Sequence, residues 1–331
     1  MDAVTIVGAG GIGCAVGYAL RSLGIEVTFV DVDAAKVRWG SKYGVHVDHL
    51  PALRAKFVTF DEWPHPDDSL IILCTKCYDN AAVLRRLPAS ATVIPIQNGF
   101  DPALANPGGV EGIASFISEC LPGKASTRIT RGGGLQFGRR SSPTGHVQEI
   151  PRAILAMTGR NPLPVRFHVQ VVPDIMPYKY TKLMYNAAIS PIAAAAGLDN
   201  GGLLSNKKAR RLFFDLLLEN YAILRDAGIP LGKVGPLHPD TVHRILRRRF
   251  IANAMAWAFY PTLRKTYCSM AGDLPRGRTE IDYYNQHLID IAGDRPCPLN
   301  RRVVEVVHAM QAALTSPSLE VLNTFTGASK V

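Results

Sequence analysis

The feature that most constrains this sequence is a glycine-rich motif near its N-terminus. The motif directly follows the apolar run Val4–Val7 and reads Gly8-Ala9-Gly10-Gly11-Ile12-Gly13. A G-x-G-x-x-G motif between a buried strand and a helix is typical of dinucleotide binding. We expect Gly8 to form a tight turn, Gly10 to let a pyrophosphate approach the backbone, and Gly13 to let the helix pack closely on the strand. Residues 8–13 are therefore predicted to bind a dinucleotide at the helix N-terminus.

An acidic residue follows the second strand-like run, residues 26–30. The carboxylate of Asp31 can accept hydrogen bonds from the adenosine ribose hydroxyls and would repel a 2′-phosphate. The predicted cofactor is therefore NAD or NADP, with NAD favoured by Asp31. Lys36 and Arg38 are close enough in sequence to weaken that preference. Asp33 is interpreted as the cap of the next helix.

The first half of the chain alternates short β-rich runs with helical segments. Four runs are predicted to be parallel strands of a doubly wound sheet: residues 4–7, 26–30, 70–74 and 92–96. Clustered glycines and β-forming residues between 123 and 172 predict further strands joined by hairpins. Pro173 and Pro177 then separate this β-rich half from a second half with a helical pattern. The predicted domains are a Rossmann dinucleotide-binding domain, 1–174, and a helical substrate and catalytic domain, 175–331.

The second half is predicted to be helical from its apolar periodicity. One helix begins near Tyr178. Ser205 is expected to cap another that stops at Gly228, and Asp240 to cap a third that runs to Tyr260. Residues 280–292 and 299–314 complete the predicted helices.

Composition and charge exclude several other classes of protein. Apolar residues make up 47% and charged residues 19% of the chain, which is typical of a globular protein. The net charge of +10 suits the attraction of an anionic dinucleotide and an anionic acid. No nucleic-acid-binding motif accompanies the basic runs at 207–211 and 247–249, so no nucleic-acid partner is predicted.

Without a secretory signal or a membrane-length apolar segment, we expect a cytoplasmic protein with no membrane partner, either a monomer or a homodimer.

The six cysteines are dispersed and do not predict a disulfide framework. Cys74 and Cys77 form a single C-x-x-C, which supplies two ligands where a structural zinc site needs four. The pair is interpreted as small side chains at a strand end. No metal site is predicted.

Polar residues at two strand ends and on one helix predict a substrate site. Lys76 and Asn98 follow the strands at 70–74 and 92–96, and open α/β sheets bind ligands at such carboxyl ends. A surface lysine and a turn asparagine are the alternative interpretation. Lys182, Asn186 and Ser190 are four residues apart, so they share one face of an otherwise apolar helix. Burial of this face against a cleft is favoured over exposure to solvent.

The sequence resembles the ketopantoate reductase (2-dehydropantoate 2-reductase) family in the order and approximate spacing of its motifs. These are the glycine motif, Lys76, Asn98-Gly99, Lys182-Leu183-x-x-Asn186 and two later segments. The later segments are Ser269-Met270 and Thr279-Glu280-Ile281-Asp282-x-x-Asn285. The resemblance spans nearly the whole chain. The Thr-Glu-Ile-Asp segment is its most specific part.

The resemblance implies a Rossmann domain followed by an all-α domain, as in 6-phosphogluconate dehydrogenase-like proteins. It implies the pantothenate-pathway reaction, NAD(P)H-dependent reduction of 2-dehydropantoate to (R)-pantoate. Lys182 would then be the general acid that protonates the carbonyl oxygen, and Glu280 would orient it. Substrate would be bound by Asn186, Ser190, Ser269 and Asn98, with Lys76 and Asn98 also near the nicotinamide.

Four departures from the family pattern leave the substrate open. Ser190 replaces a frequent asparagine, Gln286 replaces a glycine, and Val32 stands where NADP-linked members tend to have arginine. The interval from Ser269 to Glu280 is about one residue short. The chain could therefore reduce another small 2-oxo or 3-oxo acid. A non-catalytic dinucleotide-binding regulator is a further alternative, although such a protein would not need Lys182 and Glu280 together.

Overall fold

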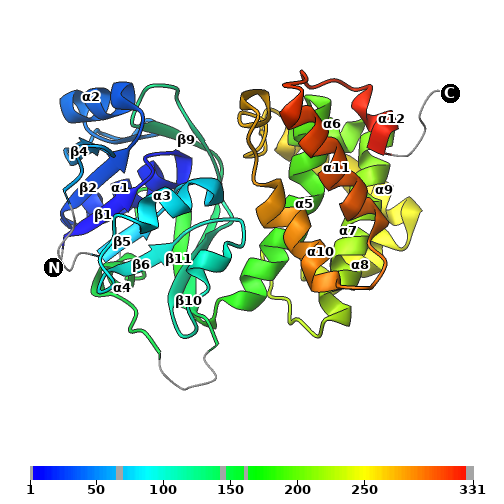
Figure 1. Cartoon of the computed structure of the whole chain (residues 1–331), viewed down its shortest axis with the longest axis horizontal. Coiled ribbons are helices and arrows are strands. Elements are labelled where there is room, and N and C mark those ends of the chain that lie inside the picture. The colour runs from blue at the N-terminus through cyan, green and yellow to red at the C-terminus, as the bar shows by residue number, and fades with distance from the viewer. Residues whose placement is uncertain (1–2, 65–69, 142–146, 160–162, 326–331) are drawn as a thin grey trace. The chain divides into compact units, whose positions relative to one another are not determined.

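A computed structural model of the chain describes residues 3–64, 70–141, 147–159 and 163–325 (Figure 1). The chain divides into two compact units, Met1–Met176 and Pro177–Val331. Within the described ranges, the strands lie in the first unit and the second unit is helical.

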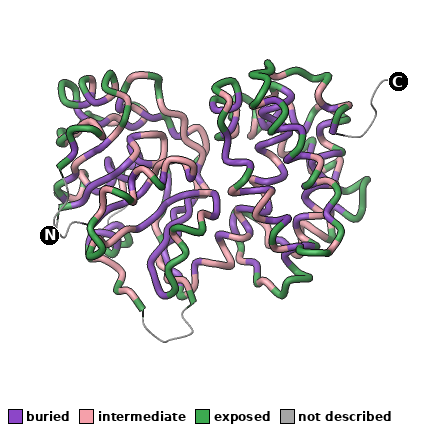
Figure 2. Tube along the Cα trace, in the orientation of Figure 1, coloured by how far each residue is buried: buried purple, intermediate pink, exposed green. Residues whose placement is uncertain are grey.

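The first unit is built on a five-stranded parallel sheet in the order β4-β2-β1-β5-β6. This is the 3-2-1-4-5 order of a Rossmann fold, so the predicted fold class is confirmed. The central strand β1 is buried at all four positions (Figure 2), as expected for a strand covered on both faces. The strands are β1 Val4–Val7, β2 Val27–Asp31, β4 Lys56–Thr59, β5 Leu70–Leu73 and β6 Thr92–Pro95.

One strand of this sheet, β4, was not predicted. Of its four residues only Phe57 is buried, so the segment lacks the continuous apolar run of the other strands. Phe57 stacks on Phe29 of β2 with ring centroids 4.8 Å apart. A contact to the neighbouring strand therefore fixes this edge of the sheet.

Helices cover the parallel sheet and connect its strands. Helix α1, Gly11–Ser22, follows β1 directly, and α2, Ala34–Tyr43, follows β2. The carboxylate of Asp33 accepts hydrogen bonds from the backbone N–H groups of Ala35 and Lys36, which confirms Asp33 as the cap of α2. The remaining helices of the unit are α3, Asn80–Leu84, and α4, Arg152–Met157.

Two three-stranded sheets complete the first unit, in the orders β11-β10-β7 and β3-β9-β8. Strands β8 and β9 pair antiparallel, although β8 lies before the range 123–172 in which hairpins were predicted. The hairpin expectation is wrong for β10 and β11, which run parallel because α4 lies between them and provides the crossover. The strands are β3 His46–Val47, β7 Val110–Ala114, β8 Ile117–Cys120, β9 Ser126–Arg131, β10 Gly133–Arg139 and β11 Phe167–Asp174.

The second unit is a helical array. Its helices are α5 Met176–Ala196, α6 Asn200–Ser205, α7 Lys207–Asp226, α8 Pro239–Leu246, α9 Arg249–Leu263, α10 His287–Ala292, α11 Pro298–Ala312 and α12 Val321–Phe325. The helix predicted at 280–292 contains a π-helical segment, Asp282–Gln286, that runs into α10. Such segments occur often at functional sites.

Two predicted helix starts are wrong. Ser205 ends α6, and Asn206 caps α7 because its side chain accepts from the N–H groups of Lys208 and Ala209. The helix expected from Asp240 to Tyr260 is two helices, since Arg248 leaves the helical conformation between α8 and α9. His238 caps the first of them, and α9 extends past Tyr260 with Pro261 inside its last turn.

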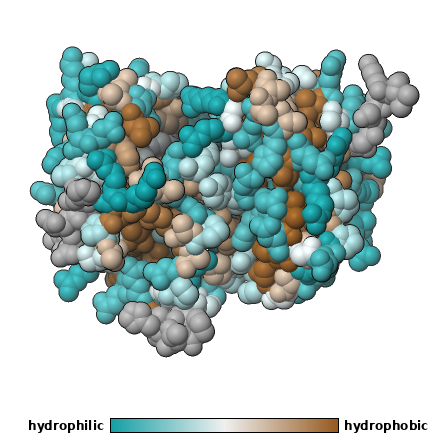
Figure 3. Space-filling model, viewed as in Figure 1, coloured by the Kyte–Doolittle hydropathy of each residue, from teal (hydrophilic) through white to brown (hydrophobic). Residues whose placement is uncertain are grey.

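On the face shown in Figure 3, hydrophilic residues cover much of both units, interspersed with hydrophobic ones. None of the helices in the described ranges combines the length and the apolar character needed to cross a membrane.

Candidate dinucleotide site and catalytic face

The glycine motif forms a turn in which each of the three key glycines meets a different physical requirement. Gly8 has φ of +97°, and a Cβ there would lie 2.8 Å from the carbonyl carbon of Cys74, the residue after the neighbouring strand β5. A Cβ on Gly13 would lie 2.0 Å from the carbonyl oxygen of Gly8, so only glycine lets α1 pack this closely. Around Gly10, by contrast, a Cβ would meet nothing within 4 Å. The loop is thus closed on its protein side and open at Gly10, which fits the approach of a dinucleotide pyrophosphate.

The other residues of the motif face the rest of the first unit. Ile12 is partly buried against the hydrophobic core. Gly11 lies against β8, since a Cβ there would be 2.6 Å from Oγ of Ser118. Strand β8 therefore packs directly on the start of α1, a contact that the sequence did not predict.

Asp31 ties the end of β2 to the glycine loop. Its Oδ2 accepts from the backbone N–H of Ala9 at 2.8 Å, and its Oδ1 accepts from the N–H of Asp33 at 2.9 Å. Nζ of Lys36 lies 3.2 Å from Oδ2 of Asp31. Burial disfavours the Lys36 ammonium, but attraction by Asp31 and Cys120 outweighs it and raises the pKa of Lys36. The ammonium of Lys36 therefore lies beside the carboxylate of Asp31.

A buried amide pair organises the loops that carry Lys76 and Asn98. Asn80 and Gln97 bond reciprocally: Nδ2 of Asn80 donates to Oε1 of Gln97 at 3.0 Å, and Nε2 of Gln97 donates to Oδ1 of Asn80 at 2.7 Å. Nε2 of Gln97 also donates to the backbone oxygen of Thr75. Because Thr75 precedes Lys76 and Gln97 precedes Asn98, the pair holds both loop residues at adjacent carboxyl ends of β5 and β6. Nothing in the sequence marked Asn80 or Gln97 as important.

The predicted polar face of α5 is present on a single continuous helix. Lys182 and Asn186 are partly buried and Ser190 is buried. Pro191 lies inside α5 and has no N–H to donate to the carbonyl oxygen of Ala187, one turn earlier. Nδ2 of Asn285 donates to that oxygen at 2.9 Å instead. The π-helical segment is thereby attached to α5 at the residue next to Asn186.

Asn285 also belongs to a larger buried network. Its Nδ2 donates to Oδ1 of Asn300 at 2.9 Å, and Nδ2 of Asn300 donates to Oδ1 of Asn220 and to Oε1 of Glu219. Nδ2 of Asn220 donates to the carbonyl oxygen of Met184 on α5 at 3.0 Å. Two turns of α5 are therefore held through buried side-chain amides, which are costly to leave without a partner.

The Thr-Glu-Ile-Asp segment forms the start of the helix that contains the π turn. Oγ1 of Thr279 accepts from the N–H of Ile281 at 3.2 Å, as a capping side chain does. Glu280 is buried, and its Oε2 accepts from the hydroxyl of Tyr284 at 3.1 Å. Asp282 faces outward and pairs with His308 on α11 at 2.9 Å. The acidic residue that stays inside is therefore Glu280.

Ser269 is exposed, whereas the preceding Cys268 approaches α5. The thiol of Cys268 donates to the carbonyl oxygen of Ser190 at 3.5 Å. Cys268 therefore lies beside α5 at Ser190. No motif in the sequence distinguishes Cys268.

Comparison with known proteins identifies the family. Residues 4–116 match the family described as ketopantoate reductase PanE/ApbA, and residues 174–311 match its C-terminal domain. The chain belongs to the ketopantoate reductase family. It is 26% identical over 325 residues to a 2-dehydropantoate 2-reductase of Pyrococcus horikoshii, covering 93% of this chain and 97% of that protein. As a member of this family, the chain is an NAD(P)-dependent oxidoreductase.

Solved structures support the same fold. A PanE/ApbA family ketopantoate reductase from Ralstonia eutropha JMP134 superposes with a TM-score of 0.71 at 22% identity, covering 94% of this chain and 99% of that one. A D-mandelate dehydrogenase in complex with NADH gives a TM-score of 0.70 at 18% identity, covering 95% and 100%. The fold of ketopantoate reductases therefore also occurs in a dehydrogenase named for a different hydroxy acid.

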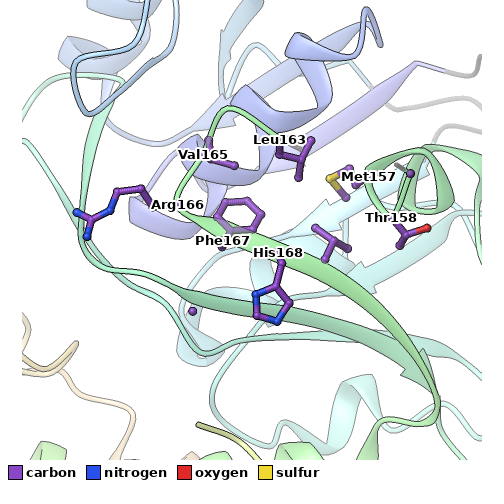
Figure 4. A pocket seen from close by; sticks show the side chains of 10 residues that line it. Met157, Thr158, Leu163, Val165, Arg166, Phe167 and His168 are labelled. Atoms are coloured by element: carbon purple, nitrogen blue, oxygen red, sulfur yellow. The ribbon is translucent and has the colours of Figure 1, made fainter. Parts of the chain in front are cut away.

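A cavity of about 570 Å³ lies elsewhere in the first unit. Its lining comes from α4, the described residues between α4 and β11, β11 itself and the start of β10, and includes Met157, Arg166 and His168. Figure 4 shows the guanidinium of Arg166 directed away from Met157 and Thr158. None of the predicted site residues of this chain lines the cavity. Among the described residues, no group of three or more His, Cys, Asp or Glu side chains is arranged to hold a metal ion.

Proposed function

We propose that this protein reduces 2-dehydropantoate to (R)-pantoate with a nicotinamide dinucleotide, NAD being preferred. The observation that carries the proposal is the polar face of α5, Lys182, Asn186 and Ser190, bound through Ala187 to the helix that begins beside Glu280. In a member of the ketopantoate reductase family, this combination supports reduction of a 2-oxo acid.

The first unit supplies the dinucleotide site. The N–H groups at the start of α1 would bind the pyrophosphate where the loop is open at Gly10. Asp31 would accept hydrogen bonds from the adenosine ribose, and Lys76 and Asn98 would lie near the nicotinamide. When bound, the reduced nicotinamide supplies a hydride.

The second unit supplies the proton and the substrate contacts. Nζ of Lys182 would donate a proton to the carbonyl oxygen as negative charge develops there. Glu280, held by Tyr284, would orient the ammonium. Asn186, Ser190 and Ser269 would bind the anionic acid, with Asn186 fixed by the neighbouring bond at Ala187. Asn98 is the one proposed substrate contact that comes from the first unit.

Reduction of another small 2-oxo or 3-oxo acid is the second candidate. Ser190 and Gln286 depart from the family pattern, and the Pyrococcus horikoshii relative is only 26% identical. A changed acid-binding face alters which substrate fits without altering the proton and hydride chemistry. We also expect a cytoplasmic protein that is a monomer or a homodimer.

The test is a substrate panel with the purified chain. NADH and NADPH oxidation would be followed with 2-dehydropantoate, with an aromatic 2-oxo acid such as phenylglyoxylate, and with acetoacetate as a 3-oxo acid. We expect the highest kcat/KM with 2-dehydropantoate and NADH. Turnover of another acid without turnover of 2-dehydropantoate would reject the proposed substrate. Dinucleotide binding without turnover of any acid would favour a regulator.

A further inference from the structure

Two thiols meet at the glycine loop, although the sequence places them far apart. Cys14 lies in the first turn of α1, and Cys120 is the last residue of β8. Both donate to the carbonyl oxygen of Ala9, with Sγ–O distances of 3.3 Å for Cys14 and 3.6 Å for Cys120. Because a thiol has a single proton, Cys14 can donate it either to Ala9 or to the neighbouring Cys120 sulfur. Cys14 is fully buried, whereas Cys120 is partly exposed.

The surroundings make Cys120 the more reactive member of the pair. The hydrogen bond from Cys14 lowers the pKa of Cys120, assisted by the ammonium of Lys36 and the N–H of Ser126 and opposed by burial and by Asp31. The same hydrogen bond, together with burial, raises the pKa of Cys14. A partly exposed cysteine with a lowered pKa beside a cation is the arrangement found at reactive thiols.

The C-x-x-C pair that the sequence analysis noted differs in this respect. Burial raises the pKa of Cys74 to about 12, and Cys77 is buried. A thiol that stays protonated reacts slowly with peroxide, so Cys74 cannot start the oxidation as Cys120 can. The motif visible in the sequence is therefore the inert one.

We propose that Cys120 and Cys14 form a peroxide-reactive pair that closes into a disulfide beside the dinucleotide loop. The Cys120 thiolate attacks one oxygen of hydrogen peroxide, the O–O bond breaks, and hydroxide leaves with the electron pair, giving a sulfenic acid. The Cys14 sulfur then attacks the Cys120 sulfur, and the sulfenic hydroxyl leaves as water with the Cys14 proton. The two cysteines are oxidised by two electrons in total, and a dithiol reductant reverses the reaction.

The disulfide weakens dinucleotide binding, a consequence that rests on the proposed cofactor site. Closure brings the two sulfur atoms to about 2.05 Å and so draws the end of β8 toward the first turn of α1. There is no spare room between them, because Gly11 already lies against Ser118. The glycine loop must shift, and Ala9 loses both thiol donors. We expect a rise of about tenfold in the Kd for NADH, which corresponds to a modest distortion of the loop.

Peptide mass spectrometry under non-reducing conditions tests the disulfide. The full-length chain treated with hydrogen peroxide should yield a linked peptide containing Cys14 and Cys120, which a dithiol removes. Cys14→Ser should stop at a sulfenic acid on Cys120 that dimedone traps, and Cys268→Ser should still form the link. Recovery of wild-type Cys120 as a free thiol, or its oxidation without linkage to Cys14, would overturn the inference.

NADH titration of reduced and oxidised protein tests the coupling. We expect the oxidised wild type to bind about tenfold more weakly, and peroxide to leave the affinity of Cys14→Ser nearly unchanged. Saturating NADH should slow disulfide formation in return, since coupling between two sites is reciprocal. Equal affinity in both redox states would overturn the coupling. Failure of the reduced protein to bind NADH would instead reject the proposed cofactor site and leave the disulfide result standing.

Discussion

The glycine loop of the first unit and the polar face of α5 in the second unit are built on opposite principles. The loop depends on missing side chains: Gly8 and Gly13 permit backbone approaches that no Cβ allows. The face on α5 depends on side chains, and one of its fixed points is a bond between Asn285 and Ala187, 98 residues apart. Backbone shape is encoded locally, whereas the helical face is assembled from distant segments.

This difference predicts how each region fails. Changes in the loop should act on folding and dinucleotide binding together, because the same atoms serve both. Changes on α5 should separate chemistry from stability, because Lys182 lies on the surface of a helix that other residues hold in place.

The largest effect is expected for Lys182→Met. Removal of the proposed proton donor should lower kcat by about 10³-fold, within the usual range for a general acid, and leave the Kd for NADH within twofold. Lys207→Met, which removes an exposed lysine at the start of α7, is the control and should leave kcat unchanged. Steady-state kinetics and NADH titration provide the measurements. An unchanged kcat for Lys182→Met would show that another group delivers the proton.

The next largest effect is expected for Gly13→Ala. The new Cβ would overlap the carbonyl oxygen of Gly8, so unfolding free energy should fall by about 3 kcal/mol. Gly10→Ala is the matched variant, since its Cβ would meet no protein atom within 4 Å. It should keep wild-type stability yet bind NADH about tenfold more weakly, because the Cβ occupies the open side of the loop. Thermal unfolding measures the stability of both variants, and titration measures their NADH affinity. Equal NADH affinity in Gly10→Ala and wild type would show that the pyrophosphate does not bind at Gly10.

A smaller effect is expected for Asn285→Ala. Loss of its bonds removes the Asn285 donor from the Ala187 oxygen and from Oδ1 of Asn300, which should cost about 2 kcal/mol of stability. Gln286→Ala is the control. Among the described contacts, the Gln286 side chain bonds only to the exposed Asp290, so its loss should change stability by less than about 0.5 kcal/mol. Denaturant unfolding compares the two. Similar stabilities for both variants would mean that α5 does not depend on the bond at Ala187.

The smallest effect is expected for Asp31→Asn. The neutral amide keeps an acceptor for the N–H of Ala9 but no longer repels a 2′-phosphate. With Lys36 next to it, the preference for NADH over NADPH should fall by about tenfold. Asp33→Asn is the control, because asparagine caps helices as well as aspartate does. The measurement is the ratio of kcat/KM with NADH to kcat/KM with NADPH. An unchanged ratio would show that residues other than Asp31 set the cofactor preference.

Much of the first unit was predictable from sequence because its determinants are local. The strand at Val4–Val7, the helix from Gly11 and the cap at Asp33 each follow from neighbouring residues. Strand β4 was missed because its place in the sheet depends on the contact between Phe57 and Phe29.

The determinants of the candidate site were less visible. The spacing of Lys182, Asn186 and Ser190 predicts a shared helical face. The sequence does not predict that Asn285 donates the hydrogen bond that Pro191 cannot, because this depends on which helices pack together. The same holds for the Asn80 and Gln97 pair and for the meeting of Cys14 with Cys120. Long-range hydrogen bonds between short polar side chains leave no periodic signal.

The most direct test of the account is to follow the hydride itself. NADH carrying deuterium at both C4 positions of the nicotinamide would be incubated with 2-dehydropantoate and the purified chain, and the product analysed by mass spectrometry. The account predicts pantoate with one deuterium at C2 and a solvent-exchangeable proton on its new hydroxyl. Absence of pantoate, or pantoate without deuterium at C2, would contradict it.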